Sequence, residues 1–131
     1  MYGPIIFSAV KTSGSYATGA YIDGYDRFLT NYGNHFSLST GIFTAPREGI
    51  FGFFTATENI LDTISAIIVE KNNAKELEFL KRDDFESPLS FSWMMELKQG
   101  DTIRLKVNGG FGFHCTPTAN CLFNGKFIRG I

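Results

Sequence analysis

The sequence lacks an excess of charge of either sign. Its 12 Lys and Arg residues nearly balance its 13 Asp and Glu residues, which leaves a formal net charge of −1. A chain so close to neutrality has no electrostatic reason to bind nucleic acid or an anionic membrane without sequence preference. The composition of 44% hydrophobic and 19% charged residues is typical of a globular chain and excludes intrinsic disorder. We therefore expect no nucleic-acid partner.

Long hydrophobic runs are also missing from the sequence. The longest, residues 64–69, is interrupted by Ser65 and is far shorter than the about 20 residues that a membrane helix needs. Residues 1–10 have neither a basic region nor a cleavage site, so they are not expected to be a signal peptide. The protein is then either leaderless or the mature domain of a longer secreted chain, and we expect no membrane insertion.

Cysteine is scarce, with Cys115 and Cys121 six positions apart. Two thiols are too few for a structural zinc site, and their spacing differs from the Cys-x-x-Cys of redox and zinc motifs. Two interpretations stay open: a disulfide that closes a small loop in an oxidising compartment, or a pair of buried free thiols. A disulfide requires Cα atoms about 4.4–6.8 Å apart, which residues facing each other across a tight hairpin satisfy.

Recognisable catalytic motifs are lacking as well. His114 directly precedes Cys115, but neighbours in a strand point to opposite faces, so the two side chains are not expected to act as base and nucleophile. No serine lies in a Gly-x-Ser-x-Gly turn. Residues 109–112 are glycine-rich but lack the Lys and the following helix of a phosphate-binding loop. We predict that the protein is not an enzyme and requires no cofactor.

Carboxylates cluster in the predicted loop 82–88, which contains Asp83 and Asp84. Hard cations prefer several oxygen ligands, so these two residues are the candidate ligands for a Ca²⁺ ion. Two or three carboxylates alone bind Ca²⁺ weakly, and a solvated polar loop is the alternative that we favour. Asp23 and Asp26, in a second predicted loop, form a weaker candidate.

Aromatic residues are abundant, with 14 Phe, 5 Tyr and 1 Trp. They lie in segments whose apolar residues recur at every second position, which is the period of a half-buried strand. Asn72 and Asn73 tolerate the positive φ of a hairpin turn. Strand and turn signals recur roughly every 8–12 residues, which is typical of an all-β sandwich or barrel. We expect a single domain over residues 1–131, with strands at residues 5–10, 50–55, 64–71, 76–81, 91–97, 103–107 and 121–128.

The phase of each strand predicts which face it buries. Apolar residues on the inward phase predict a core formed by Phe7, Phe36, Phe43, Phe51, Phe53, Leu105 and Phe123. Fourteen Phe residues exceed what one core of this size usually holds, and strands 50–55 and 121–128 are apolar in both phases. A sandwich buries only its inner faces, so the surplus predicts an outer face covered by another subunit. The candidate interface residues are Phe54, Leu122 and Ile128.

Several short motifs follow one another along nearly the whole chain. They are Ile-Phe-Ser-Ala at 6–9, Tyr-Asp-Arg-Phe at 25–28, Asn-Tyr-Gly-Asn-His-Phe at 31–36, Thr-Gly-Ile-Phe-Thr-Ala-Pro at 40–46, Gly-Ile-Phe-Gly-Phe at 49–53, Leu-Lys-Gln-Gly-Asp-Thr-Ile at 97–103 and Phe-Asn-Gly-Lys-Phe-Ile at 123–128. Each motif alone carries little information. In this order, they resemble the globular head of complement C1q from its opening strand to its closing strand.

The resemblance implies an all-β, ten-stranded antiparallel jelly-roll sandwich of the C1q and tumour necrosis factor superfamily. It also implies a compact homotrimer in which the first and last strands are adjacent. The chain departs from the family at Ala45, where cysteine is frequent, at Asn120-Cys121-Leu122, and in showing no collagen stalk. These departures indicate a divergent member and favour an invertebrate one.

The function implied is that of a secreted, trimeric recognition module. It would bind a carbohydrate, lipid or protein ligand on an exposed loop face, in the lectin-like manner of pattern recognition in innate immunity. Three copies of a weak site on one rigid face give avidity for repeating targets without any new contact. The alternative is a cytokine-like or adhesive ligand that engages a protein receptor.

Overall fold

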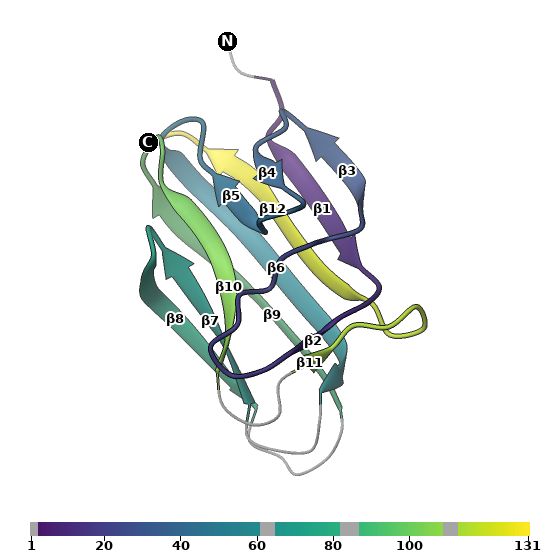
Figure 1. Ribbon diagram of the computed structural model, residues 1–131. Helices are drawn as coiled ribbons and strands as arrows, with labels where there is room; N and C mark the ends of the chain where they lie inside the picture. The colour runs from purple at the N-terminus through teal and green to yellow at the C-terminus, as the bar shows by residue number, and fades with distance from the viewer. Residues whose placement is uncertain (1–2, 61–64, 82–86, 109–112) are drawn as a thin grey trace.

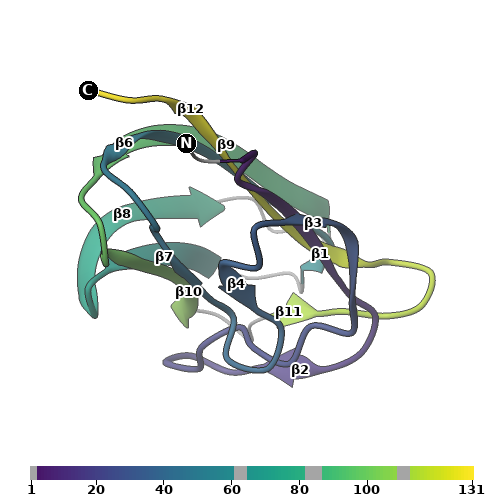
Figure 2. The same cartoon turned by 90° about the horizontal axis from the view of Figure 1, so that it is seen from above.

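The computed structural model describes residues 3–60, 65–81, 87–108 and 113–131. These residues form two β-sheets that pack face to face (Figures 1 and 2). Within the described ranges, no helix is long and apolar enough to cross a membrane. The strands are β1 (Ile6–Lys11), β2 (Ser15–Tyr16), β3 (Arg27–Tyr32), β4 (Phe36–Ser37), β5 (Ile42–Thr44), β6 (Gly49–Ile60), β7 (Ser65–Lys71), β8 (Ala74–Lys81), β9 (Ser87–Leu97), β10 (Thr102–Asn108), β11 (Phe113–His114) and β12 (Cys121–Arg129).

The two sheets have the arrangement of a jelly roll. The seven-stranded sheet has the order β2-β11-β6-β12-β1-β3, with β9 paired to the other edge of β6, and the five-stranded sheet has the order β4-β5-β10-β7-β8. The first and last strands, β1 and β12, pair antiparallel, and the two termini lie at the same end of the sandwich (Figure 1). The expected all-β jelly-roll class is confirmed. The described strands number twelve rather than ten, and three of them, β2, β4 and β11, have only two residues.

Aromatic rings from both sheets fill the core. The ring of Phe7 stacks on that of Phe36, with 4.3 Å between centroids, and Phe123 meets both rings edge to face. All seven residues expected in the core are at most 3% exposed: Phe7, Phe36, Phe43, Phe51, Phe53, Leu105 and Phe123. Burial of this much aromatic surface is the main favourable term in the stability of a small sandwich.

Gly125 allows these rings to reach the backbone of β12. A Cβ atom at this position would lie 2.4 Å from Cε1 of Phe7 and 3.0 Å from the ring of Phe53. Real Cβ atoms do not approach other atoms so closely, so any larger residue would push one of the rings away. Glycine on the last strand thus permits the close approach of the rings.

The turns follow the residue types that favour positive φ. Asn72 and Asn73 have φ values of 53° and 67° and form a two-residue turn between β7 and β8, as expected for a type I′ hairpin. Gly100 has φ of 89° between β9 and β10, and Oδ2 of Asp101 accepts a hydrogen bond of 2.8 Å from the backbone N–H of Lys98. The turn at Asn72 and Asn73 occurs where the sequence predicts it.

One predicted boundary is wrong. Pro88 belongs to β9 rather than to a loop that ends at this residue, and residues 82–86 lie outside the described residues. β9 is an edge strand that pairs with β6 alone, so the missing N–H of a proline is tolerated there. The sequence prediction also omitted β3, which pairs with β1 across a register shift between Ser8 and Ala9.

Candidate functional site

A groove of about 910 Å³ crosses the outer face of the seven-stranded sheet. Strands β1, β3, β6, β9 and β12 all contribute to it. Its apolar walls include Ile6, Phe54, Met94 and Ile128, and we call this surface the outer groove. Lys126 is the one charged side chain among the described residues that line it. The surface therefore presents apolar contact area with little charge.

The alternation of the strands produces the outer groove. In β6 and β9, Phe53 and Trp93 pair in register and contact each other on the inner side, while their neighbours Phe54 and Met94 line the groove. Met94 is 70% exposed, which is the largest exposure among the large hydrophobic residues described. Gly52 leaves the floor open, because a Cβ atom there would lie 3.2 Å from Cδ1 of Ile128.

The three candidate interface residues share the outer face of this sheet, although only two of them line the outer groove. Phe54 is half-buried and Ile128 is 42% exposed, and both line the groove. Leu122 is half-buried, pairs with Ala56, and lies outside the groove. The structure thus places the predicted residues on one face.

Sequence reasoning missed two of the most exposed residues of the outer groove, Ile6 and Met94. Met94 lies between Ser92 and Glu96 on the phase of its strand that otherwise carries polar residues. The sequence contains a weak signal for Met94, because a long apolar side chain on the polar phase of a strand indicates a second covered surface.

A polar pair lies on the floor of the outer groove. The hydroxyl of Ser8 on β1 donates a hydrogen bond of 2.6 Å to Oδ1 of Asn124 on β12. Both residues are half-buried and line the groove. The Ser8 hydroxyl and the Asn124 oxygen thus pair with each other, and the amide hydrogens of Asn124 remain donors for a partner that covers this floor.

The side of the sandwich formed by β8 and β9 is a second apolar surface, which we call the β8/β9 edge. The ring of Phe79 on β8 stacks on that of Phe91 on β9, with 4.1 Å between centroids, although the strands belong to different sheets. Both rings are only half-buried. Leu80, also on β8, is 42% exposed. The protein thus has an apolar groove on one sheet and, at a neighbouring edge, half-buried rings that pack against the core, with Leu80 exposed on the opposite face of β8.

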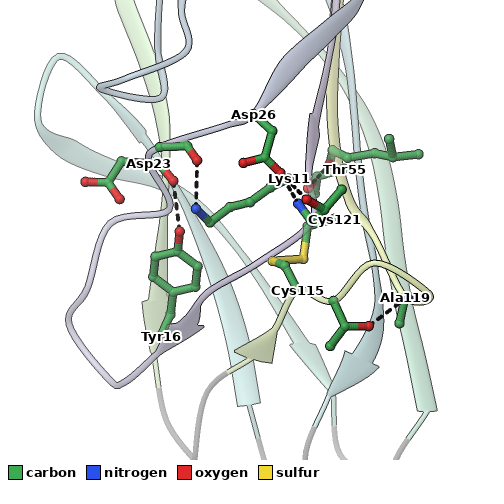
Figure 3. Close-up of a disulfide and its surroundings, with 12 residues drawn as sticks. Lys11, Tyr16, Asp23, Asp26, Thr55, Cys115, Ala119 and Cys121 are labelled. Atoms are coloured by element: carbon green, nitrogen blue, oxygen red, sulfur yellow. Dashed lines mark hydrogen bonds between the residues drawn. A yellow bond between two sulfur atoms is a disulfide. The ribbon is translucent and has the colours of Figure 1, made fainter.

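A disulfide lies at one corner of the sandwich (Figure 3). The structure joins Cys115 and Cys121, whose Cα atoms are 5.4 Å apart, and no free cysteine remains. Both residues are buried, and the N–H of Cys115 donates a hydrogen bond of 2.9 Å to the carbonyl of Gly14. Of the two interpretations left open by the sequence, the structure contains the disulfide. A bonded Cys115 cannot act as a nucleophile beside His114.

The same corner buries a lysine (Figure 3). Lys11 is 7% exposed, and its ammonium donates a hydrogen bond of 2.8 Å to the carbonyl of Gly24 and lies 5.3 Å from the ring centroid of Tyr16. The hydroxyl of Tyr16 in turn donates to the carbonyl of Asp23 over 2.8 Å. These contacts hold the segment between β1 and β3 in place, so we interpret this corner as structural.

Asp26 is engaged within the chain rather than free for a cation. Its Oδ2 accepts hydrogen bonds from the hydroxyl and from the backbone N–H of Thr12, the latter over 2.5 Å. These two bonds lower the pKa of the Asp26 carboxyl below its usual value. In the part of the chain that the structure describes, no three His, Cys, Asp or Glu side chains form a group able to hold a metal ion.

The other calcium candidates, Asp83 and Asp84, lie outside the described residues. The calcium site therefore stays a prediction of the sequence.

The model of the C1q domain matches residues 6–128. The chain belongs to the C1q domain family. A mouse relative, "Complement C1q and tumor necrosis factor-related protein 9", is 30% identical over 93 residues, which are 69% of this chain and 27% of the mouse protein. This C1q domain thus spans about a quarter of the length of that relative.

Solved structures share the fold of this C1q domain at low sequence identity. The globular domain of zebrafish complement 1qA superposes with a TM-score of 0.78 at 18% identity, covering 97% of this chain and 99% of the zebrafish one. Eiger TNF from S. frugiperda gives a TM-score of 0.76 at 10% identity, covering 99% of this chain and 96% of that one. At such identities, the likeness establishes the jelly-roll fold.

Proposed function

We propose that this C1q domain is a secreted, homotrimeric recognition module that binds extracellular or non-self ligands in a lectin-like manner. The observation that carries the proposal is the outer groove, where Met94, Ile128 and Ile6 are 70%, 42% and 38% exposed on one sheet face. An exposed apolar surface of this kind on a globular domain is typical of a protein–protein interface. We assign it to a second copy of the same chain.

The two apolar surfaces lie on different sides of the sandwich, which allows a head-to-tail contact between copies. In the assembly that we propose, the outer groove of one copy covers the β8/β9 edge of the next. Such a head-to-tail contact closes into a ring when the rotation between neighbours allows it. Membership of the C1q domain family and the tumour necrosis factor-like fold support a ring of three.

Secretion is supported by the disulfide between Cys115 and Cys121. Disulfides form and persist in oxidising compartments and are rare in the cytosol. The near-neutral charge of the chain, −1, also leaves the subunits of a trimer with little mutual repulsion.

The ring would place three identical ligand sites in a fixed relation. A weak site repeated on a rigid body gains avidity for a target that is itself repetitive, such as a polysaccharide or a microbial surface. We propose no enzymatic role, because binding and avidity account for the assembly without chemistry.

Light scattering tests the assembly directly. We expect a mass near three times 14.6 kDa at micromolar concentration. The Phe54→Glu variant should shift toward monomer, because a charge in the outer groove would be desolvated in the interface. Leu29→Glu is the matched control, since Leu29 is 56% exposed and does not line the groove, and it should remain a trimer. A parent protein that stays monomeric across the concentration range would refute the trimer.

A second experiment separates the recognition module from the alternative, a cytokine-like ligand. We expect the trimer to bind glycans on an array and to do so more strongly at higher glycan density. Tight capture of one cell-surface protein receptor with indifference to every glycan would favour the cytokine-like function instead.

A further inference from the structure

A second groove, of about 820 Å³, lies on the side of the sandwich opposite the β8/β9 edge. Phe28 on β3 reaches it from the seven-stranded sheet, while β4 and β5 border it from the five-stranded sheet. The two sheets meet here through an edge-to-face contact of Phe28 with Phe36, with 6.3 Å between centroids. In Figure 1, β4 and β5 lie toward the end that holds both termini. We call this surface the edge groove.

Neutral polar groups dominate the edge groove. None of the described residues that line it is Lys, Arg, Asp or Glu. The hydroxyl of Thr44 is exposed and forms no hydrogen bond with the described part of the chain. The side-chain oxygen of Asn34 accepts from Asn31 over 3.5 Å, which leaves its amide hydrogens as donors. The polar lining residues are Asn34, His35, Ser37, Ser39, Thr40 and Thr44.

The backbone beneath these groups is held in one conformation. Gly41 has φ of 71°, and a Cβ atom there would lie 2.3 Å from the carbonyl oxygen of Ile22, so only glycine fits. Its N–H donates a hydrogen bond of 2.8 Å to the carbonyl of Ser37. Asn34 lies in the left-handed region, with φ of 57°. A groove fixed in this way loses little conformational entropy when a ligand binds.

We propose that the edge groove binds a neutral saccharide. The inference rests on the proposed recognition function and gives it a site and a ligand class. A sugar ring carries several hydroxyls, which pair with side chains that both donate and accept, such as Thr44 and Ser39. Its C–H faces pack on apolar side chains, which Phe28, Ile42 and Pro46 provide.

Two other ligand classes fit the edge groove less well. An anionic ligand such as a phosphate or a sulfated glycan is usually held by Arg or Lys, and the described lining has neither. An extended peptide that adds a strand to the sheet needs a free edge of several residues; β4 has only two, and the six-residue edge strand β3 contributes only Phe28 to the groove. A neutral, hydroxyl-rich ligand matches the groups that are present.

Binding to immobilised polysaccharides tests the proposal. The probes are mannan, dextran and a β-1,3-glucan as neutral chains, with heparin as the anionic comparison. We expect the parent protein to be retained by at least one neutral chain. Thr44→Val removes one hydroxyl while keeping the shape, and Asn34→Gly removes the amide at a left-handed position. Each should weaken binding about 3–10-fold, the effect of losing one neutral hydrogen bond. Thr18→Val, in an exposed turn outside the groove, should leave binding unchanged.

Three results would overturn the proposal: no retention on any neutral chain, retention on heparin alone, or equal binding by Thr44→Val and Thr18→Val. Capture of extended peptides without polysaccharide would do the same. The edge groove lies within one chain, so the monomeric Phe54→Glu variant should still show backbone amide shifts near Thr44 with millimolar mannose or glucose in NMR spectra. A parent protein that is trimeric but lacks these shifts rejects the saccharide site and leaves the assembly intact, whereas a parent protein that is monomeric and shows them rejects the assembly alone.

Discussion

The ring of Phe43, from the five-stranded sheet, meets the ring of Phe53, from the seven-stranded sheet, edge to face with 5.6 Å between centroids. Phe43 meets Phe51 in the same way, also at 5.6 Å. Phe43 is 1% exposed, so it fills the space between the sheets without contact with solvent. The side chain of Phe43 therefore connects the two sheets, although the strand that carries it, β5, is short.

Phe43→Ala should lower the free energy of unfolding by about 3–5 kcal/mol, because the cavity left among the rings cannot collapse. Chemical denaturation followed by tryptophan fluorescence measures it. Tyr32→Ala is the control: Tyr32 is 55% exposed, and its loss should change stability by about 0.5 kcal/mol or less. A Phe43→Ala variant as stable as this control would mean that the assigned strand phase is wrong.

The core residues could be predicted from the sequence because the alternation of apolar and polar residues along a strand determines which side chains are buried. In β10 the buried residues Ile103, Leu105 and Val107 alternate with half-buried polar ones, and a shift of one residue would expose all three. The hairpin at Asn72 was predictable for an equally local reason, since Asn tolerates positive φ. The edge position of Pro88 was not, because it depends on strand pairing far along the chain.

Gly125→Ala should destabilise the protein by about 1–3 kcal/mol, the usual range for overpacking a filled core. The new methyl group would lie 2.4 Å from the ring of Phe7, and Phe53 closes off the other side. Thermal unfolding measures the loss. Gly3→Ala is the matched control, because a Cβ atom there meets nothing within 4 Å, and its melting temperature should equal that of the parent.

Replacing Cys115 and Cys121 together by Ala should cost roughly 2–3 kcal/mol, mainly because the unfolded chain gains freedom when the small loop is opened. Intact mass before and after alkylation checks the parent protein, which should take up no alkyl group unless it is first reduced. Reductant should destabilise the parent and leave the double variant unchanged. Two thiols that alkylate in the folded protein without reduction would contradict the bridge.

The disulfide shows where the residue pattern stops being informative. A spacing of six positions is compatible with paired or free thiols, and only the fold brings the two Cα atoms to 5.4 Å. The outer groove is similar: the surplus of Phe predicts an interface, but only the pairing of β9 with β6 places Met94 beside Phe54 on that surface. The alternation of apolar and polar residues predicts which face of a strand each side chain occupies, whereas the topology of the fold determines which strands lie side by side.

Acidification should destabilise the protein partly through Asp26. Hydrogen bonds from Thr12 lower the pKa of this carboxyl in the folded state below its usual value of 3.8. Its contribution to stability is therefore fully present above about pH 4 and is lost as the pH falls through the lower, folded pKa. NMR titration of the Asp26 carboxyl measures the shift directly, and Thr12→Val should bring the pKa back toward 3.8. An unshifted pKa in the parent would exclude the contribution.

A mixing experiment tests whether the contact in the proposed trimer is head to tail. Met94→Glu places a charge in the outer groove but leaves the β8/β9 edge intact, whereas Leu80→Glu does the reverse. Both side chains are exposed in the single chain, at 70% and 42%, so neither change should prevent folding. Each variant alone should be monomeric by light scattering, because every interface needs one groove and one edge.

An equimolar mixture should instead form a dimer. The intact groove of the Leu80→Glu variant can bind the intact edge of the Met94→Glu variant. The other groove of this dimer carries the Met94→Glu change, and its other edge carries the Leu80→Glu change. Both remaining surfaces are therefore blocked, and the ring cannot close. The mass should rise to twice 14.6 kDa and no further. The control is a mixture of two Met94→Glu proteins that carry different tags, and these should not associate.

A symmetric contact, in which the groove of one copy packs on the groove of another, predicts a different outcome. The Leu80→Glu variant alone would then still associate, and mixing it with Met94→Glu would produce no further association. That result would replace the three-fold ring by a two-fold dimer and remove the avidity argument built on three sites.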